Sequence, residues 1–190
     1  MNKILYKHYV FLDTINSLIE KNLNKIKNIN IIVDINHNNK GELKEKLSII
    51  NFAKKNKIPF FLKYDYNECF KRNSNGILID SFNKKTIKPI SLKKNFIIIG
   101  IAHNQLEYLQ KKKQGCTLVM LSPLFYNEKY TNNKILNVLK FNNKKLSWGE
   151  EICALGGINS KNIKKINLLN ITKVAFKKFI LEVKKNPLTN

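Results

Sequence analysis

Two adjacent glycines form the strongest chemical signal in the sequence. Gly156 and Gly157 lie between a short apolar run, 152–155, and a polar segment that begins at Ser160. Glycines at such a point let the backbone approach a ligand closely, and free N–H groups where a helix begins favour an anion. The pattern indicates either an anion-binding turn or simply a tight strand-to-helix turn, and the residue types alone leave both open.

A histidine follows another apolar run. His103 comes directly after the run 96–101 and Ala102. Active-site residues of parallel barrels collect at the C-terminal ends of strands, and a histidine there can transfer a proton near neutral pH. The alternative is a histidine that only caps the next helix. His8 and His37 have polar neighbours in the sequence and are predicted to be surface residues.

A third segment follows a buried run in the same way. Ser122 and Pro123 come after the run 117–121, and a polar loop then extends to Asn137. Loops over the mouth of a barrel often close on a substrate, although a merely solvated loop fits the composition equally well.

All three segments follow apolar, strand-like runs, and such runs recur along the whole chain. The runs are 9–12, 29–35, 58–62, 76–79, 96–101, 117–121, 152–155 and 174–180. Most of these runs are continuously apolar rather than alternating, which is typical of strands in a parallel sheet that is covered on both faces.

Helical periodicity appears between several of these runs. Residues 42–53 carry an apolar stripe, Asn104 begins a helix that ends near Gly115, and Ser160 is predicted to cap a helix over 161–167. The pattern predicts an α/β protein, a compact (β/α)8 TIM barrel of one domain over residues 1–190. An open doubly wound sheet is the structural alternative.

The formal net charge of +22 suggests a nucleic-acid partner at first sight. However, Arg72 is the only arginine, and arginine is the residue that best recognises phosphates and bases. Lys, Asn and Ile, whose codons are rich in A and T, account for 89 of the 190 residues. We therefore interpret the charge as compositional drift and predict no nucleic-acid partner.

Other features of the sequence limit the classes to which this protein can belong. No run of about 18 apolar residues exists, so no membrane partner is expected, and the N-terminal residues do not resemble a signal peptide. The cysteines, Cys69, Cys116 and Cys153, form no C-x-x-C pair and are predicted to be free thiols. A cytoplasmic protein is expected, and a homo-oligomer is left open.

The order of the motifs resembles a known family. Gly100-x-x-His103, Ser122-Pro-Leu-Phe125 and Ala154-Leu-Gly-Gly-Ile158 are similar to the Gly-x-Ser-x-His, Gly-Pro-x-Phe and Ala-Ile-Gly-Gly-Ile motifs of the thiamine phosphate synthase/TenI family. The similarity extends from about residue 96 to residue 163. It implies a (β/α)8 barrel that binds a thiazole phosphate and, in the synthase, an aminopyrimidine diphosphate with magnesium.

The resemblance implies roles for particular residues. It assigns general acid/base catalysis to His103, and phosphate binding to Gly156 and Gly157. At the end of the last strand the family's small-residue turn is replaced by Phe176-Lys-Lys-Phe179, where Lys177 and Lys178 could either bind the phosphate or obstruct the pocket. The residues implied in the substrate pocket are Lys63, Asp80, Ser122 and Pro123.

The chain departs from the synthase pattern at the positions that bind diphosphate and metal in the synthase. A Gln-x-Arg-x-Lys cluster after strand two is replaced by residues 32–36, with Asp34 in the place of the arginine. An Asn-Asp pair after strand three is replaced by Lys63 and Tyr64. Because phosphoryl transfer needs cations and a metal, these changes argue against diphosphate chemistry.

The expected function is therefore that of a TenI-like protein of thiamine biosynthesis. Its partner is predicted to be a small phosphorylated thiamine precursor, such as a thiazole phosphate, with a tautomerase-type proton transfer. No metal and no cofactor are expected, and magnesium would be needed only if synthase activity is retained. The alternatives are a thiamine phosphate synthase with substituted site residues, and a non-catalytic relative that binds a thiamine precursor or has a regulatory role.

Overall fold

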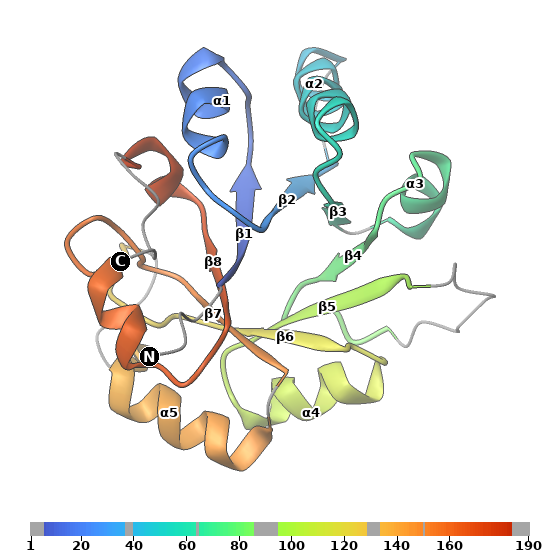
Figure 1. Cartoon of the computed structure of the whole chain (residues 1–190). Helices are drawn as coiled ribbons and strands as arrows, with labels where there is room; N and C mark the ends of the chain where they lie inside the picture. The colour runs from blue at the N-terminus through green and yellow to red at the C-terminus, as the bar shows by residue number, and fades with distance from the viewer. Residues whose placement is uncertain are drawn as a thin grey trace.

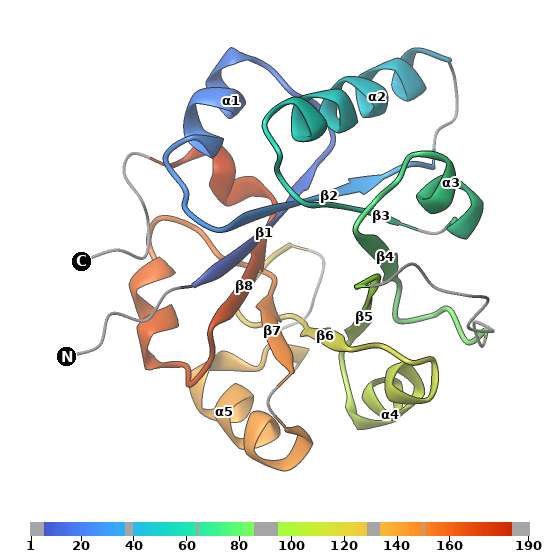
Figure 2. The same ribbon diagram turned by 45° about the vertical axis from the view of Figure 1, so that its right-hand side comes forward.

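The computed structural model describes residues 6–36, 40–63, 65–85, 95–128, 134–149 and 151–183. Eight parallel strands follow one another in chain order and close into a barrel, because β1 pairs with both β2 and β8 (Figure 1). The helices surround the strands, as the rotated view in Figure 2 also shows. The predicted (β/α)8 barrel is thus confirmed, and the open doubly wound sheet is excluded.

The strands agree closely with the apolar runs of the sequence. Each of the first seven begins and ends within two residues of its run. The strands are β1 Lys7–Leu12, β2 Ile29–Asp34, β3 Phe60–Lys63, β4 Gly76–Ile79, β5 Ile97–Ala102, β6 Leu118–Leu121, β7 Ile152–Leu155 and β8 Lys173–Phe176.

Helices lie in the connections between the strands, apart from the β4–β5 connection, whose described residues 80–85 and 95–96 contain none. The α-helices are α1 Ser17–Leu23, α2 Lys40–Lys55, α3 Tyr66–Lys71, α4 Gln105–Lys113 and α5 Asn137–Trp148, and the short 3-10 helices are η2 Ile163–Leu168 and η3 Lys178–Leu181. The predicted helices over 42–53 and from Asn104 are confirmed as α2 and α4, and the side chain of Asn104 accepts the N–H of Glu107 as a helix cap. None of the helices in the described ranges is long and apolar enough to span a bilayer.

The predicted helix over 161–167 is wrong. The Asn159 side-chain oxygen accepts the N–H groups of Lys161 and Asn162, at 3.0 and 3.2 Å, and such a local turn competes with a helix. The Ser160 N–H is bonded to Glu182. A 3-10 helix therefore replaces the α-helix and begins only at Ile163.

The predicted strand over 174–180 is wrong in its second half. β8 ends at Phe176, and the apolar residues Phe179 and Ile180 lie in η3. Both side chains are buried, and the Ile180 carbonyl accepts a hydrogen bond from the Asn22 amide of α1 at 2.9 Å. The apolar run continues past the strand because η3 also packs into the core.

The barrel interior is filled with side chains. An inner cluster contains alternate residues of the strands, while the other residues of the strands face a second, larger cluster beneath the helices. Both faces are apolar, which explains the continuous runs in the sequence. The inner cluster consists of Tyr9, Ile32, Phe61, Leu78, Ile99, Leu118, Met120, Cys153 and Ala175. A ligand is therefore expected at the mouth rather than inside the barrel.

His8 lies in the protein interior, so the prediction of a surface residue is wrong. Its exposed fraction is 3%, and its Nδ1 atom lies 2.8 Å from the Lys27 carbonyl oxygen. Burial lowers the pKa of the imidazole below its ordinary value. The polar sequence neighbours were misleading because Lys7 points to solvent while His8, the next residue of the strand, points inward. His37 lies outside the described residues.

We expect the free energy of unfolding to fall as the pH is lowered from 7.5 to 5.5. The unfolded chain binds a proton at His8 near its ordinary pKa of about 6.5, whereas the folded chain does so only at a lower pH. Stability is therefore retained above the unfolded pKa and lost below it, by at most about 1.4 kcal/mol per pH unit. Urea unfolding at several pH values should show a shallower pH dependence in His8→Gln. Equal slopes for both proteins would contradict the assignment.

Candidate functional site

The C-terminal ends of β1 and of β5 to β8 meet around one cavity. This cavity has a volume of about 500 Å³, and Ser122, Gly156, Gly157, Lys177 and Lys178 all line it. The structure thus brings together the four predicted phosphate-binding residues and one predicted pocket residue. The other lining residues are Phe11, Ile101, Tyr126, Asn127, Glu128, Leu155, Ile158, Asn159, Phe176 and Glu182.

The two glycines allow a close approach between two loops. Gly156 and Gly157 have φ angles of +96° and +73°, and a Cβ atom on Gly157 would lie 2.2 Å from the Phe125 carbonyl oxygen. The Phe125 N–H in turn donates to the Gly156 carbonyl oxygen at 3.0 Å. The tight-turn interpretation is therefore correct as an explanation of why glycine is required here.

The same turn retains features of an anion site. Within the described ranges, no protein group accepts a hydrogen bond from the backbone N–H groups of Gly157 and Ile158. Both residues line the cavity. Successive backbone N–H groups in such a turn can bind an anion.

The charged residues of this cavity are partly paired with one another. Lys177 forms an ion pair with Asp13, which follows β1, and the Lys178 ammonium lies 3.9 Å from the Glu128 carboxylate. Burial alone would raise the pKa of the Asp13 carboxyl, but the Lys177 and Lys46 ammonium groups hold it below its usual value. The Lys178 side chain is 83% exposed, so it is the more available cation of the two lysines.

A glutamate already occupies the start of the turn after β7. The Glu182 carboxylate accepts the N–H of Ser160 at 2.8 Å, and hydrogen bonds from Ser160 lower the pKa of this carboxyl. Because Glu182 also lines the cavity, an incoming phosphate and this carboxylate compete for the same end of the site.

Three charged residues form a cluster on the other side of the mouth. The Lys63 ammonium lies 3.2 Å from a carboxylate oxygen of Asp34 and 3.0 Å from one of Asp80. β2, β3 and β4 are neighbours in the barrel, so their ends bring the three side chains together. Lys63 and Asp80, predicted in the substrate pocket, thus lie at the mouth but do not line the 500 Å³ cavity.

This cluster was not predicted as a unit. The motif comparison identifies Asp34 only as a replacement for an arginine, and its pairing with Lys63 depends on the register between strands. A signal was nevertheless present, because a charged residue lies within one position of the end of each of three consecutive apolar runs.

A buried lysine holds the loop that carries Asp80. Lys111 of α4 has no exposed surface, and its ammonium donates to the carbonyl oxygens of Asp80 and Asn83 and to the Gln114 side chain. Burial lowers the pKa of this ammonium, although nearby acidic groups oppose the change. A Cβ atom on Gly100 would lie 2.8 Å from the Lys111 side chain, so this glycine makes room for it.

His103 is held by a carboxylate at the end of β5. One Glu107 oxygen accepts the His103 backbone N–H at 2.8 Å and lies 2.9 Å from the ring Nδ1. A carboxylate at Nδ1 favours the tautomer that carries its proton there, so proton exchange would use Nε2. Asn104, and not His103, caps the following helix. His103 does not line the 500 Å³ cavity.

Pro123 belongs to the loop that closes over the glycines. It follows Ser122 through a cis peptide bond, and its Cα atom would lie 3.2 Å from a Cβ atom on Gly156. Ser122 is buried beside it, and its N–H donates to the Ala102 carbonyl oxygen at 3.0 Å. The polar loop that continues to Asn137 lies partly outside the described residues.

The residues at the mouth do not fit a resident magnesium ion. Mg²⁺ prefers carboxylate oxygens, but the Lys63 ammonium lies between Asp34 and Asp80, where a shared metal ion would have to bind. Over the described ranges, no three His, Cys, Asp or Glu side chains gather into a metal-binding group.

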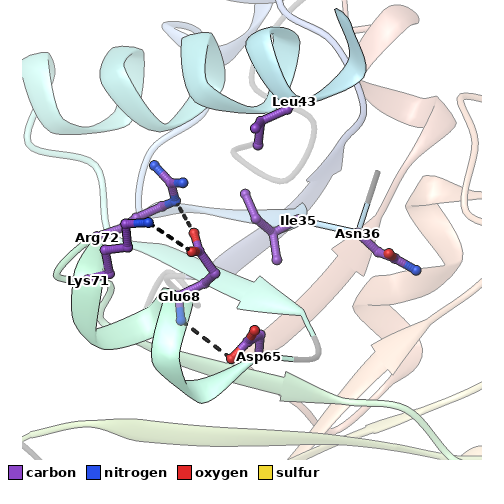
Figure 3. Close-up of a pocket in the computed structure, with 7 residues that line it drawn as sticks. All are labelled: Ile35, Asn36, Leu43, Asp65, Glu68, Lys71 and Arg72. Atoms are coloured by element: carbon purple, nitrogen blue, oxygen red, sulfur yellow. Dashed lines mark hydrogen bonds and ion pairs between the residues drawn. The ribbon is translucent and has the colours of Figure 1, made fainter. Parts of the chain in front are cut away.

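A second cavity lies between α2 and α3 (Figure 3). Its volume is about 640 Å³, and its lining residues are Ile35, Asn36, Leu43, Asp65, Glu68, Lys71 and Arg72. The Arg72 Nε lies 2.6 Å from the Glu68 carboxylate, and Asp65 caps α3. None of the predicted site residues lines this cavity, and its charged groups serve to hold α3.

Comparison with known proteins supports the resemblance seen in the motifs. The chain is 34% identical over 79 residues to a thiamine-phosphate synthase from Prochlorococcus marinus, and the match spans 41% of this chain and 23% of that protein. No family model matches the sequence.

The fold is also shared with solved structures. A thiamine phosphate pyrophosphorylase from Pyrococcus furiosus superposes with a TM-score of 0.70 at 17% identity, over 96% of this chain and 92% of that one. One from Bacteroides thetaiotaomicron gives a TM-score of 0.57 at 13% identity, over 94% and 93% of the two chains. This chain is therefore similar in sequence to a thiamine-phosphate synthase over 79 residues, and it shares the barrel fold of the two pyrophosphorylases over nearly its whole length.

Proposed function

We propose that this protein binds a small phosphate monoester at the mouth of the barrel and catalyses a tautomerase-type proton transfer on it. The observation that carries this proposal is the cavity that gathers Gly156, Gly157, Lys177 and Lys178 at the C-terminal ends of the strands. The similarity to thiamine-phosphate synthase makes thiazole phosphate the first ligand to test.

Phosphate binding and proton transfer are assigned to residues at the ends of different strands. The N–H groups of Gly157 and Ile158 and the Lys178 ammonium would bind the phosphate, because backbone donors and lysines both suit this anion. His103, oriented by Glu107, would transfer the proton. This proton transfer does not need the residues that bind diphosphate and metal in the synthase.

Binding is tested by thermal unfolding with thiazole phosphate and with the matching thiazole alcohol. We expect the phosphate to raise the Tm with increasing concentration and the alcohol to have little effect, because a ligand that binds only the folded state stabilises it. Equal effects of the two compounds, or no effect of either, would contradict the phosphate site.

His103→Ala should abolish turnover and leave phosphate binding almost unchanged. Loss of a general acid/base is expected to lower kcat by about 100-fold or more, whereas the histidine does not line the phosphate cavity. Turnover is measured with an unrearranged thiazole phosphate, and binding by calorimetry. Glu107→Gln retains the His103 imidazole but weakens the contact that orients it, so a smaller loss of kcat is expected. Unchanged turnover in His103→Ala would refute the catalytic role.

Glu182→Gln should bind phosphate more tightly than the unmodified protein. The substitution removes a negative charge from the cavity wall, and we expect the Kd of inorganic phosphate to fall roughly fivefold. Glu45→Gln, on the exposed surface of α2, changes the net charge equally and should have little effect. If both variants behave alike in calorimetry, the competition at Ser160 is not real.

A non-catalytic role is the second candidate. It is favoured by one observation, that His103 does not line the cavity. Ligand binding without turnover, in assays for both tautomerisation and coupling, would support a binding or regulatory protein. Rescue of a thiamine auxotroph that lacks its synthase would instead support thiamine phosphate synthesis.

A further inference from the structure

The cavity between α2 and α3 is separate from the one at the mouth of the barrel. It has a volume of about 640 Å³, and none of its lining residues also lines the 500 Å³ cavity. Cavities that bind small molecules in other proteins measure about 300 to 1,000 Å³. The cavity therefore has room for a small ligand of its own.

One side of this cavity is aliphatic. Ile35, which follows β2, is 6% exposed and belongs to the core beneath the helices, and Leu43 of α2 packs against the same core. In Figure 3, Leu43 points from α2 toward Ile35. We refer to these two side chains as the apolar wall. Because the core holds both of them, the apolar wall is in place before a ligand binds, and a methylene chain that lies on it is withdrawn from water.

The other side is a charged face of α3. Asp65, Glu68 and Arg72 are spaced by three and four positions, so they project from the same side of the helix. Figure 3 shows all three beside the apolar wall. Asp65 and Arg72 stand at the two ends of α3, and their separation of seven positions corresponds to about 10 Å along the helix axis. The cavity thus has a carboxylate at one end and a guanidinium at the other.

The Arg72 guanidinium has donors that the protein does not use. Its side chain is 19% exposed, and its Nε atom donates to Glu68 at 2.6 Å, but no described residue accepts a hydrogen bond from either terminal nitrogen. Both terminal nitrogens point toward α2 in Figure 3, away from the Glu68 carboxylate. N–H groups that are largely withdrawn from water favour the binding of an acceptor.

The charge at the Arg72 end of the cavity is positive. Glu68 carries one negative charge against the two positive charges of Lys71 and Arg72, which leaves a formal charge of +1. A planar guanidinium with free terminal N–H groups matches the geometry of a carboxylate. The acceptor expected at this end is therefore a carboxylate.

The Asp65 end attracts a cation instead. The Oδ1 atom of Asp65 accepts the N–H groups of Asn67 and Glu68, at 2.8 and 3.4 Å, and so caps α3. Its Oδ2 atom accepts no hydrogen bond from the described residues, none of which forms an ion pair with this carboxylate. A ligand ammonium would therefore find an unused acceptor at this end.

We propose that this cavity binds a dipolar aliphatic molecule of the ω-amino carboxylate class. The carboxylate of the ligand would bind the Arg72 guanidinium, its ammonium would bind Asp65, and its methylene chain would lie on the apolar wall. An α-amino acid is disfavoured, because both of its charged groups are attached to one carbon and cannot reach the two ends together. This site is independent of the phosphate-binding turn, so either site can exist without the other.

The test is a length series of ω-amino carboxylates, from glycine to aminooctanoate, titrated into the full chain by calorimetry. Alkanoates and alkylamines of equal chain length are the references. We expect an optimum at an intermediate length, where the ω-amino carboxylate binds roughly tenfold more tightly than either reference. Below the optimum, each added methylene should tighten binding roughly threefold. Equal binding of the three series, or no binding by any of them, would overturn the proposal.

Two variants locate the ligand. Asp65→Asn keeps a residue type that caps helices well and removes only the charge, so α3 should remain folded while the preference over alkanoates is lost. Arg72→Lys keeps a positive charge but removes the guanidinium, and should weaken binding of the best probe roughly threefold. Glu45→Gln, the charge-matched control on the exposed surface of α2, should bind like the unmodified protein. If Asp65→Asn and Arg72→Lys bind the series unchanged, or if Glu45→Gln weakens binding equally, the ligand lies elsewhere and the proposal is wrong.

Discussion

Replacing Gly157 by alanine is expected to lower the free energy of unfolding by about 3 kcal/mol, and to disturb the mouth of the barrel. Two physical causes add up. A residue with a side chain at a φ angle of +73° costs about 1 kcal/mol, and an atom 2.2 Å from a carbonyl oxygen forces the neighbouring loop to move, at about 2 kcal/mol. Because Phe125 and Tyr126 belong to that loop, phosphate binding should weaken as well.

Gly149→Ala is the matched control for this experiment. Gly149 has a φ angle of +99°, yet a Cβ atom there would have no neighbour within 4 Å. Its ψ angle of −173° places it in a region that only glycine adopts readily, so it should show the conformational cost alone, roughly 2 kcal/mol in urea unfolding, and leave ligand binding intact. If the two variants lose equal stability, the contact between the glycine turn and the Phe125 carbonyl is not a determinant of the fold.

The second large effect is expected for Lys111→Met. The variant retains the aliphatic bulk of the side chain but removes the donor from two buried acceptors, the Asp80 carbonyl oxygen and the Gln114 side-chain oxygen. An unsatisfied buried acceptor costs about 1 to 3 kcal/mol, so we expect a loss of about 4 kcal/mol in all. Asn83 keeps a bond from Gln114 and limits the loss.

Lys113→Met makes the same chemical change at an exposed position of the same helix. Its stability should change by less than about 0.5 kcal/mol. Hydrogen exchange should also show that residues 80–85 open more readily in Lys111→Met than in this control. Equal protection of the loop in both variants would contradict the anchoring role of Lys111.

The barrel could be predicted from sequence because its physical cause is local. A strand covered on both faces must be apolar at successive positions, and the runs 96–101 and 117–121 can therefore be recognised in the sequence as strands. The same reasoning failed at Phe179 and Ile180, where an apolar segment is buried without being a strand. Apolar character reports burial, and the backbone conformation follows only when the length and the flanking residues agree.

The candidate site was predictable only in part. Gly156 and Gly157 stand out because a tight turn demands their backbone angles, and Lys177 and Lys178 share their cavity because β7 and β8 are adjacent. The ion pairs of Lys63 could not be read from the chain, because Asp34 is 29 positions away and their contact depends on strand register. Burial of His8 was missed for a similar reason, since its neighbours along the strand face the other way.

The contact between Gly100 and Lys111 has a consequence for how this chain can evolve. Any larger residue at position 100 collides with the lysine stem, so it is tolerated only after that stem has been shortened. A shorter residue at position 111 is itself harmful unless the acceptors of the loop find other donors. Each residue thus constrains the mutations available to the other. Among the lysines of this sequence, Lys111 is therefore one that substitution could not easily remove.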